Sequence, residues 1–443
     1  MTAIITNNFR LNAAKEFVDD VENNSSYYLF IGRSEAWTND ASPDTPYDNT
    51  YALADAWQSM QAMKEITEND VIFAAPRYQW VSGTTYTEYD DRDANLEGKQ
   101  YYVISDNNNV YLCLKSGGIS TKNPDIEGVT TSGVIDYTGD DGYIWKYLFT
   151  VSTEDSNKFL TSAFIPVRFL AADPGVGADS ALLNQYDVQE NAVDGAIYNI
   201  KITAGGTGYT SAPTVTIQGD GSNATATATV TAGVVTNITV TNPGSGYKQV
   251  KVTISGGGGS GATAYAVLSP AGGFGADPRN DLRAHYVGIN SRLIYADGGG
   301  DFIVGNDFRQ IGLIRNPYNY GTTTVATAET LAATKSLEIA TGETFAADAV
   351  IEGSSTGAKA IVDSYDAVNG IIRYHQTEET GFVDFTTSDT IRLEGETGTG
   401  QTVNAVNNPE VEPYSGEIIF LENRTPVNRA TDQIETIKLV LEF

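Results

Sequence analysis

An internal repeat in the middle of the chain limits the folds that are open to it. The motif Gly-x-Gly-Tyr at 206–209 returns at 244–247, and the Val-containing run at 214–217 returns at 251–254. Glycines adopt left-handed turns without steric cost, so the tyrosine can pack across them while the second run forms a strand. Two copies are few for a solenoid. We therefore predict a small inserted β-domain at 195–270.

A second, weaker repeat lies closer to the C-terminus. Residues 345–365 resemble residues 385–406, and each copy has an aromatic residue, a strand pattern, a turn rich in Gly, Ser and Thr, and another strand pattern. The 44 glycines and 25 tyrosines of the chain also favour strands and tight turns over helices. We predict a second inserted β-module at 321–409 and a mainly β protein with multi-domain β-sandwich architecture.

Helices are expected only near the start of the chain. The spacing of apolar residues predicts a short helix at 11–22 and a longer one at 51–66. The apolar stripe of the longer helix includes Trp57, and Thr50 or Asp48 can cap its free N–H groups. Short strand patterns, separated by turns rich in Asp, Asn and Gly, are predicted at 27–31, 71–75, 100–104, 110–114, 143–151 and 310–314.

The C-terminal stretch is interpreted as two strands joined by a turn. A strand pattern at 417–421 is followed by the turn-like sequence Glu-Asn-Arg-Thr-Pro-Val at 422–427. Ile437, Leu439 and Leu441 then share one face at a period of two. Because free termini normally fray, we expect a sheet to hold this end of the chain.

Charge and cysteine content weigh against several classes of function. The 443 residues include 27 basic and 56 acidic ones, and the formal net charge of −29 repels phosphates and argues against nucleic-acid binding. Cys113 is the only cysteine, so no intrachain disulfide can form, and its strand-like surroundings predict a buried thiol. We find neither a signal-peptide pattern nor an apolar run of about 18 residues, and expect assembly in a cytoplasm without membrane contact.

The sequence also lacks the common catalytic and metal-binding patterns. His285 and His375 are the only histidines, and neither has a metal-binding partner at helical spacing, so we interpret both as structural. A Ser-His-Asp or Cys-His site remains open by residue count, although no nucleophile-elbow motif accompanies the histidines. The run at 296–301 weakly resembles a calcium-binding Gly/Asp turn. We predict no catalytic residue, no cofactor and no metal ligand.

Several separated blocks of sequence occur in the same order as blocks of a known family. They are FIGRSEAW at 30–37, DAWQSM at 55–60, PRYQW at 76–80, GYIWKYLF at 142–149, FRQIGLIRNP at 308–317, and the tail from 415 to 433. Together they resemble the baseplate wedge protein of T-even-type contractile phages, the eighth-gene product family. The two Gly-rich modules fall outside the resemblance and are interpreted as insertions.

The resemblance implies a core formed by 1–194, 271–320 and 410–443, interrupted by the modules at 195–270 and 321–409. It also implies a homodimer within each wedge of the tail baseplate, in contact with other wedge subunits of the virion. Such a subunit takes part in the rearrangement that triggers sheath contraction and turns over no substrate. The resemblance does not assign a role to the two modules. Contact with a host surface is one role that we keep open for them.

Two alternatives from other classes are kept. A receptor- or glycan-binding tail protein would use exposed tyrosines of the Gly/Tyr modules to stack on sugars, and a glycan-degrading enzyme would need paired carboxylates in a cleft. Partner-interface residues are not predicted. Arg33 and Glu35 could pair with each other or with a partner, while Trp37, Trp80 and Trp145 are expected in the core.

Overall fold

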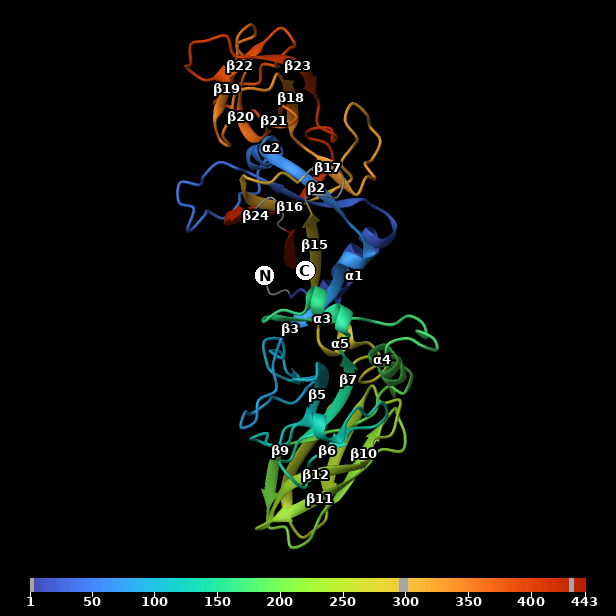
Figure 1. Ribbon diagram of the computed structural model, residues 1–443. Coiled ribbons are helices and arrows are strands. Elements are labelled where there is room, and N and C mark those ends of the chain that lie inside the picture. Colours follow the sequence, from blue (N-terminus) through green and yellow to red (C-terminus); the bar gives the residue numbers. More distant parts are fainter. Residues whose placement is uncertain (1–3, 295–301, 430–433) are drawn as a thin grey trace. The chain divides into compact units, whose positions relative to one another are not determined.

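The computed structural model describes residues 4–294, 302–429 and 434–443, and the protein is mainly β with several domains, as predicted. The chain divides into two compact units (Figure 1). The first unit comprises Met1–Lys15, Ile72–Gly288 and Val440–Phe443, and the second comprises Glu16–Val71 and Ile289–Leu439. Four of the described elements run from one unit into the other: α1 (Asn7–Asn23), β3 (Val71–Pro76), β15 (Tyr286–Ile294) and β25 (Ile434–Glu442).

An antiparallel sheet of five strands, in the order β17-β2-β1-β16-β24, forms the centre of the second unit. Its strands are β1 (Tyr27–Gly32), β2 (Met60–Ile66), β16 (Asp307–Arg315), β17 (Thr330–Ala332) and β24 (Glu417–Asn428). Every residue of β1 is buried. Gly312 on β16 makes this packing possible, because a Cβ there would lie 2.3 Å from the Phe30 ring. The sheet is the core from which the loops of the functional site extend.

The helix predicted at 51–66 is wrong in its second half. Helix α2 (Thr50–Gln58) ends at Ser59, and the following residues form strand β2, in which Met63 pairs with Phe30 of β1. Pairing with a buried strand therefore overrides the helical spacing of the apolar residues. The cap is Asn49, whose side chain accepts a hydrogen bond from the Ala52 N–H at 2.9 Å, rather than Thr50 or Asp48.

The turn predicted at 422–427 is also wrong, because these residues continue strand β24 alongside β16. Pro426 is compatible with this position because β24 is the edge strand of its sheet, where the missing N–H leaves no ladder bond unmade. The final strand pattern is confirmed in β25, where Ile437 and Leu439 are buried and Lys438 between them is exposed.

The first unit contains a four-stranded sheet in the order β4-β5-β7-β6. The strands are β4 (Tyr102–Ile104), β5 (Asn109–Lys115), β6 (Ile135–Asp136) and β7 (Ile144–Thr150). The rings of Tyr143 and Trp145 stack in its core at a centroid distance of 5.3 Å, and Cys113 is fully buried beside them, as predicted. Burial raises the pKa of the Cys113 thiol well above its usual value, so the thiol stays protonated.

Further elements complete the described secondary structure. A third sheet has the order β25-β15-β3-β8 and contains β3 (Val71–Pro76) and β8 (Phe164–Val167). The remaining helices are α3 (Thr153–Phe159), α4 (Ser180–Glu190) and α5 (Pro278–Asp281), with 3-10 turns at Glu68–Asp70 and Pro124–Glu127.

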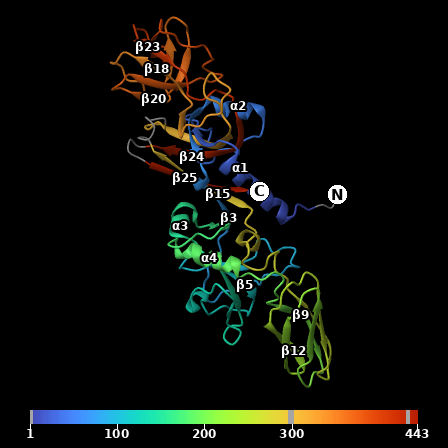
Figure 2. The same ribbon diagram turned by 90° about the vertical axis from the view of Figure 1, so that its right-hand side faces the viewer.

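The Gly/Tyr module is an intertwined pair of three-stranded repeats. The first repeat holds β9 (Ile200–Thr207), β10 (Thr214–Gly219) and β11 (Thr225–Thr231), and the second holds β12 (Val234–Asn242), β13 (Val250–Ser255) and β14 (Ser260–Ala266). Strand β9 pairs with β14, β12 pairs with β11, and the central strands β10 and β13 pair with each other. Each repeat thus completes the sheet of the other. Figure 2 shows the module, with one strand of each repeat, β9 and β12, labelled.

Two equivalent contacts between a tyrosine and a glycine hold the repeats together. In each of these contacts, called cradles here, the tyrosine ring of one repeat lies against a glycine of the other. Tyr209 and Tyr247 are both buried, and each hydroxyl accepts a backbone N–H bond at 3.3 Å. A Cβ on Gly221 would lie 2.5 Å from the Tyr247 ring, and a Cβ on Gly259 would lie 2.5 Å from the Tyr209 ring. The motif glycines at 206, 208, 244 and 246 all adopt positive φ, as predicted. The tyrosine rings, however, pack against Gly221 and Gly259 and not across those turns.

The second module is a closed barrel with the same kind of internal symmetry. Its strand order is β18-β21-β20-β19-β22-β23. The strands are β18 (Lys335–Ile339), β19 (Val350–Gly353), β20 (Lys359–Asp366), β21 (Ile371–His375), β22 (Thr390–Leu393) and β23 (Gln401–Asn407). Strand β18 pairs with β21, and β19 pairs with β22, so two copies of a three-stranded unit close the barrel. Phe345 and Phe385, which the sequence repeat aligns, both enter its core.

We predict that Gly221→Ala destabilises the protein by about 1–3 kcal/mol, because the added methyl group overlaps the Tyr247 ring and the backbone around Ser245. Gly139→Ala is the matched control, since a Cβ at Gly139 meets nothing within 4 Å. Urea unfolding of the three proteins measures the difference. Equal stability of both variants would contradict the cradle.

Candidate functional site

A sharp loop after strand β1 is the starting point of a buried polar network in the second unit. Gly32 ends the strand so close to the start of β2 that a Cβ on it would lie 2.8 Å from the Ser59 carbonyl oxygen. Arg33 follows with φ 60, a left-handed conformation that is rare for a residue with a long side chain. Its N–H donates to the Ser59 carbonyl at 2.8 Å, which fixes the turn.

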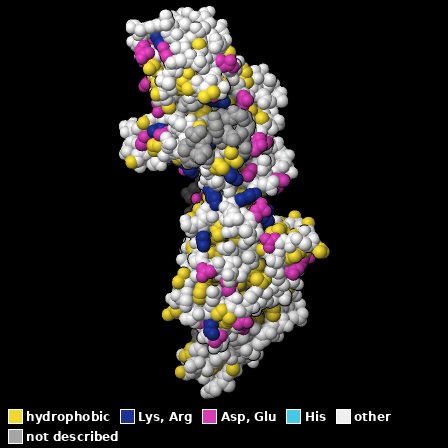
Figure 3. Space-filling view, viewed as in Figure 1, with side chains coloured by type: hydrophobic (Ala, Val, Ile, Leu, Met, Phe, Trp, Pro, Cys, Tyr) yellow, Lys and Arg dark blue, Asp and Glu magenta, His cyan; other side chains and the backbone are white. Residues whose placement is uncertain are grey.

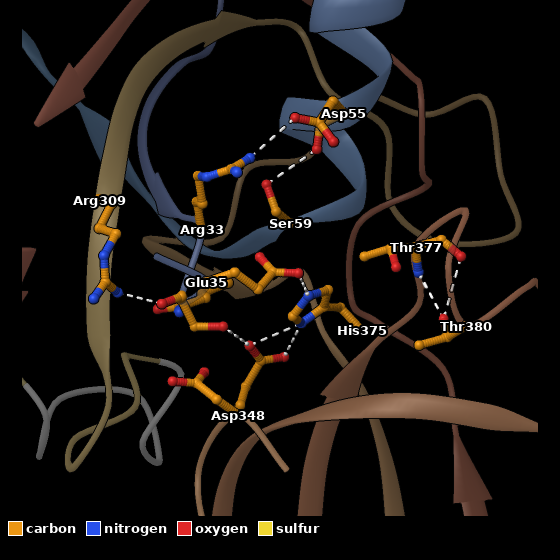
Figure 4. A network of polar contacts seen from close by, with 12 residues as sticks. Arg33, Glu35, Asp55, Ser59, Arg309, Asp348, His375, Thr377 and Thr380 are labelled. Atoms are coloured by element: carbon orange, nitrogen blue, oxygen red, sulfur yellow. Dashed lines mark hydrogen bonds and ion pairs between the residues drawn. The ribbon is translucent and has the colours of Figure 1, made fainter. Parts of the chain in front are cut away.

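This loop carries Glu35 to a histidine of the barrel (Figure 4). The Nε2 atom of His375 lies 3.0 Å from Glu35 Oε1, and its Nδ1 atom lies 3.0 Å from both carboxylate oxygens of Asp363. His375 and Asp363 come from strands β21 and β20 and are both buried. The imidazole therefore lies between two carboxylates, one from the barrel and one from the loop.

The two carboxylates keep a positive charge on His375. Burial opposes that charge, but the negative charge of Asp363 and the hydrogen bonds to both carboxylates outweigh it and raise the pKa of His375 to about 10. Burial also opposes the charge of Glu35, yet its hydrogen bond with His375 and the histidine's charge hold the pKa of Glu35 below its usual value. Burial raises the pKa of Asp363, and the charge and hydrogen bond of His375 oppose that rise. The charge of His375 thus lies between the two carboxyl groups, and the pairing favours the ionised form of each.

An arginine of strand β16 holds the same loop from the other side. The Arg309 guanidinium forms a two-pronged contact with Asp40, with both N–O distances at 3.1 Å, and it also donates to the Ser34 carbonyl. Hydrogen bonding from Arg309 lowers the pKa of the Asp40 carboxyl. Such forked pairs fix orientation as well as charge. The loop is thus fastened at Ser34, Glu35 and Asp40.

A third set of contacts joins the loop to helix α2 and strand β24. Arg33 Nη1 lies 3.3 Å from Asp55 Oδ2 on α2, and the guanidinium carbon lies 3.9 Å from the centroid of the Trp37 ring. The Trp37 indole N–H donates to the Arg424 carbonyl at 3.0 Å. Arg424 itself pairs with Glu422 of the same strand at 2.9 Å.

These positions correct and extend the sequence-based expectations. Arg33 and Glu35 do not pair with each other: Arg33 pairs with Asp55 and Glu35 with His375. His375 is a satisfied structural histidine, as predicted, but its two carboxylate partners were not recognised. The calcium-like turn at 296–301 lies outside the described residues.

The three tryptophans differ in burial. Trp145 is fully buried, whereas Trp37 and Trp80 are only partly so. The other histidine, His285, belongs to the first unit, where both of its ring nitrogens lack a hydrogen-bond partner among the described residues. The interpretation as a satisfied structural histidine is therefore wrong for His285.

The network can hold the loop in place, but His375 cannot act as a general base in it. Both nitrogens of His375 face carboxylates, so the ring has no lone pair with which to take a proton from a nucleophile. Ser34 Oγ lies 3.4 Å from Asp363 Oδ1, which is a contact to the acid and not to the imidazole. The geometry therefore stabilises one position of the loop relative to the barrel within this unit.

A cleft of about 210 Å³ adjoins the network and is lined in part by His375. Its walls include Trp57 and Tyr414, whose rings lie 6.3 Å apart, and Phe382. Phe382 and Tyr414 each expose more than half of their surface. Aromatic faces of this kind are suited to apolar or sugar rings.

Comparison with protein-family models and with curated proteins finds no match for this chain. Among the described helices, none combines the length and the apolar character that a membrane crossing requires.

We predict a pH dependence of stability that comes from His375. Its pKa is raised from about 6.5 in the unfolded chain to about 10 in the fold, so its contribution is complete below pH 6.5 and is lost as the pH rises through 10. The free energy of unfolding of the wild type should therefore fall between pH 6.5 and 10, relative to that of His375→Gln, by roughly 4 kcal/mol.

Urea unfolding at a series of pH values measures this difference. Glu35→Gln keeps the histidine but removes one carboxylate, and should show a smaller decline. Glu379→Gln, at an exposed position four residues after His375, is the matched control and should follow the wild type. Parallel profiles for the wild type and His375→Gln would contradict the charged histidine.

Proposed function

We propose that this chain is a structural subunit of the baseplate wedge of a contractile phage tail, and that it acts without turning over a substrate. The proposal rests on the resemblance of sequence blocks that lie far apart in the chain. One structural observation supports the proposal beyond the resemblance: residues of four of these blocks contact one another in a single polar network. Blocks 30–37, 55–60 and 308–317 supply the loop, helix and strand contacts, and the tail supplies Arg424.

The meeting of the blocks supports a mechanical role. The residues that carry the resemblance hold segments of the fold in fixed positions, and His375, their partner in the barrel, has both ring nitrogens occupied. A subunit that transmits a rearrangement between neighbours needs rigid elements joined by defined contacts. In this proposal the loop at 33–40 is such an element, held by charge pairs that a neighbouring subunit could compete for.

The acidic surface suits a protein that assembles only with defined partners. With a net charge of −29, copies of the chain repel one another at a distance, which slows unwanted association. Asp and Glu side chains are spread over the visible face instead of gathering in one place (Figure 3). We propose that association into a homodimer and with other wedge subunits relies on local shape and hydrogen bonding.

One observation weakens the alternative of a receptor- or glycan-binding protein, and another favours it. Tyr209 and Tyr247 of the Gly/Tyr module are buried and cannot stack on sugars. The cleft lined by Trp57, Phe382 and Tyr414 instead offers exposed aromatic faces in the second unit. Glycan contact remains the second candidate function, with that cleft as its site.

Immunogold labelling of intact phage particles tests the proposal, with an antibody raised against this chain. We expect gold at the baseplate, in rings of sixfold character. Gold along the fibres or at their tips would contradict the wedge assignment and favour the glycan-binding alternative. The same particles labelled with pre-immune serum provide the background.

We also predict that the Gly/Tyr module can be removed without loss of the dimer. The ends of the module meet, since the Val267 N–H donates to the Asn199 carbonyl at 3.0 Å, so a short Gly-Ser linker can replace 200–266. Light scattering after size exclusion should give twice the mass of one chain for both the shortened protein and the full chain of 47.4 kDa. A monomeric shortened protein beside a dimeric full chain would place the interface in the module.

A further inference from the structure

A buried histidine of the first unit has an unusual lack of partners. His285 is 1% exposed, and neither of its ring nitrogens forms a hydrogen bond among the described residues. Its Nε2 atom lies 3.4 Å from Glu97 Oε1, outside hydrogen-bond geometry. A buried polar group without a partner costs free energy, so such a group in a native fold calls for a ligand or a function.

Two carboxylates converge on this imidazole from other parts of the same unit. Glu97 lies in the loop before β4, His285 stands just before β15, and Glu442 is the last residue of β25. One ligand atom from each residue lies within 4.8 Å of the other two. The backbone fixes this meeting, since the Phe443 N–H donates to the His285 carbonyl at 3.3 Å.

The cluster can be reached from solvent. Glu97 and Glu442 are exposed by 45% and 60% of their side-chain surface. A cleft of about 430 Å³ is lined by Glu97, His285 and Tyr286, among others. The Tyr286 hydroxyl hydrogen-bonds the Glu442 carboxylate and so helps to orient it. An ion can therefore enter and meet a site whose three donor groups already face one another.

We propose that Glu97, His285 and Glu442 form a binding site for a divalent transition-metal ion of the zinc type. One imidazole nitrogen and two carboxylate oxygens are common zinc ligands, with bond lengths of about 2.0–2.2 Å, and water completes the shell. Ligand atoms within 4.8 Å of one another close onto such an ion with small side-chain movements. The imidazole nitrogen disfavours magnesium, which prefers oxygen ligands.

Arg10 competes with a metal ion for the carboxylates of Glu97 and Glu442. Its Nη1 atom lies 3.3 Å from Glu97 Oε1 and 3.9 Å from Glu442 Oε1. The guanidinium offers only donors, so it can balance the acids but cannot accept from or coordinate to His285. A metal ion satisfies all three groups at once, and Arg10 then turns toward solvent.

Titration calorimetry of the full chain with zinc chloride, and separately with magnesium chloride, tests the site. We expect one zinc ion per chain, and binding at least about tenfold weaker in Glu97→Gln and in Glu442→Gln. Glu190→Gln, which alters an exposed glutamate elsewhere in the same unit, should bind as the wild type does. Arg10→Gln should bind more tightly because the competing charge is gone.

Cobalt(II) provides a second readout that does not depend on the heat of binding. The wild type should give visible d–d bands of bound cobalt(II), and these bands should weaken or shift in His285→Asn, whose folding is checked by circular dichroism. If that variant does not fold, the two glutamate variants decide the matter. No zinc binding by the wild type, or equal binding by Glu442→Gln and Glu190→Gln, would overturn the proposal.

Discussion

The chain of charges Glu35, His375 and Asp363 is the interaction on which the arrangement of the second unit depends. It joins a loop near the start of the chain to strands of the barrel, across 340 positions of sequence. Removing water from three charged groups costs several kcal/mol for each ion, and their mutual attraction offsets this only when the geometry is good. Because an isolated member would be left as a buried charge, the three groups specify one position of the loop.

Both Gly-rich modules are stabilised in the same way: each consists of two copies of a short unit, and each copy stabilises the other. A unit of three strands has unpaired edges, and in each module the edges of one copy are covered by strands of the other. The small residues allow this close approach. In the Gly/Tyr module the tyrosines fill the space above glycines 221 and 259, which explains why they are not available for binding.

The sequence predicts well what is local and repeated. The glycine turns, the buried tyrosines, the free thiol of Cys113 and the final strand all follow from spacing and residue type. It fails where tertiary pairing competes with a local pattern. Residues 60–66 have helical spacing but lie against a buried strand, and the Pro426 segment has turn composition but lies at a sheet edge. The network was missed because its partners are distant in sequence and carry no shared motif.

The most direct test of this account is the protonation state of His375, read from the nitrogen chemical shifts of its imidazole by NMR at pH 8. The chain has two histidines, so spectra of His285→Asn assign the signals. The account predicts protons on both Nδ1 and Nε2 of His375, as for an imidazolium, because its pKa is about 10. A neutral ring with a single protonated nitrogen at that pH would contradict the charge chain and with it the proposed fastening of the loop.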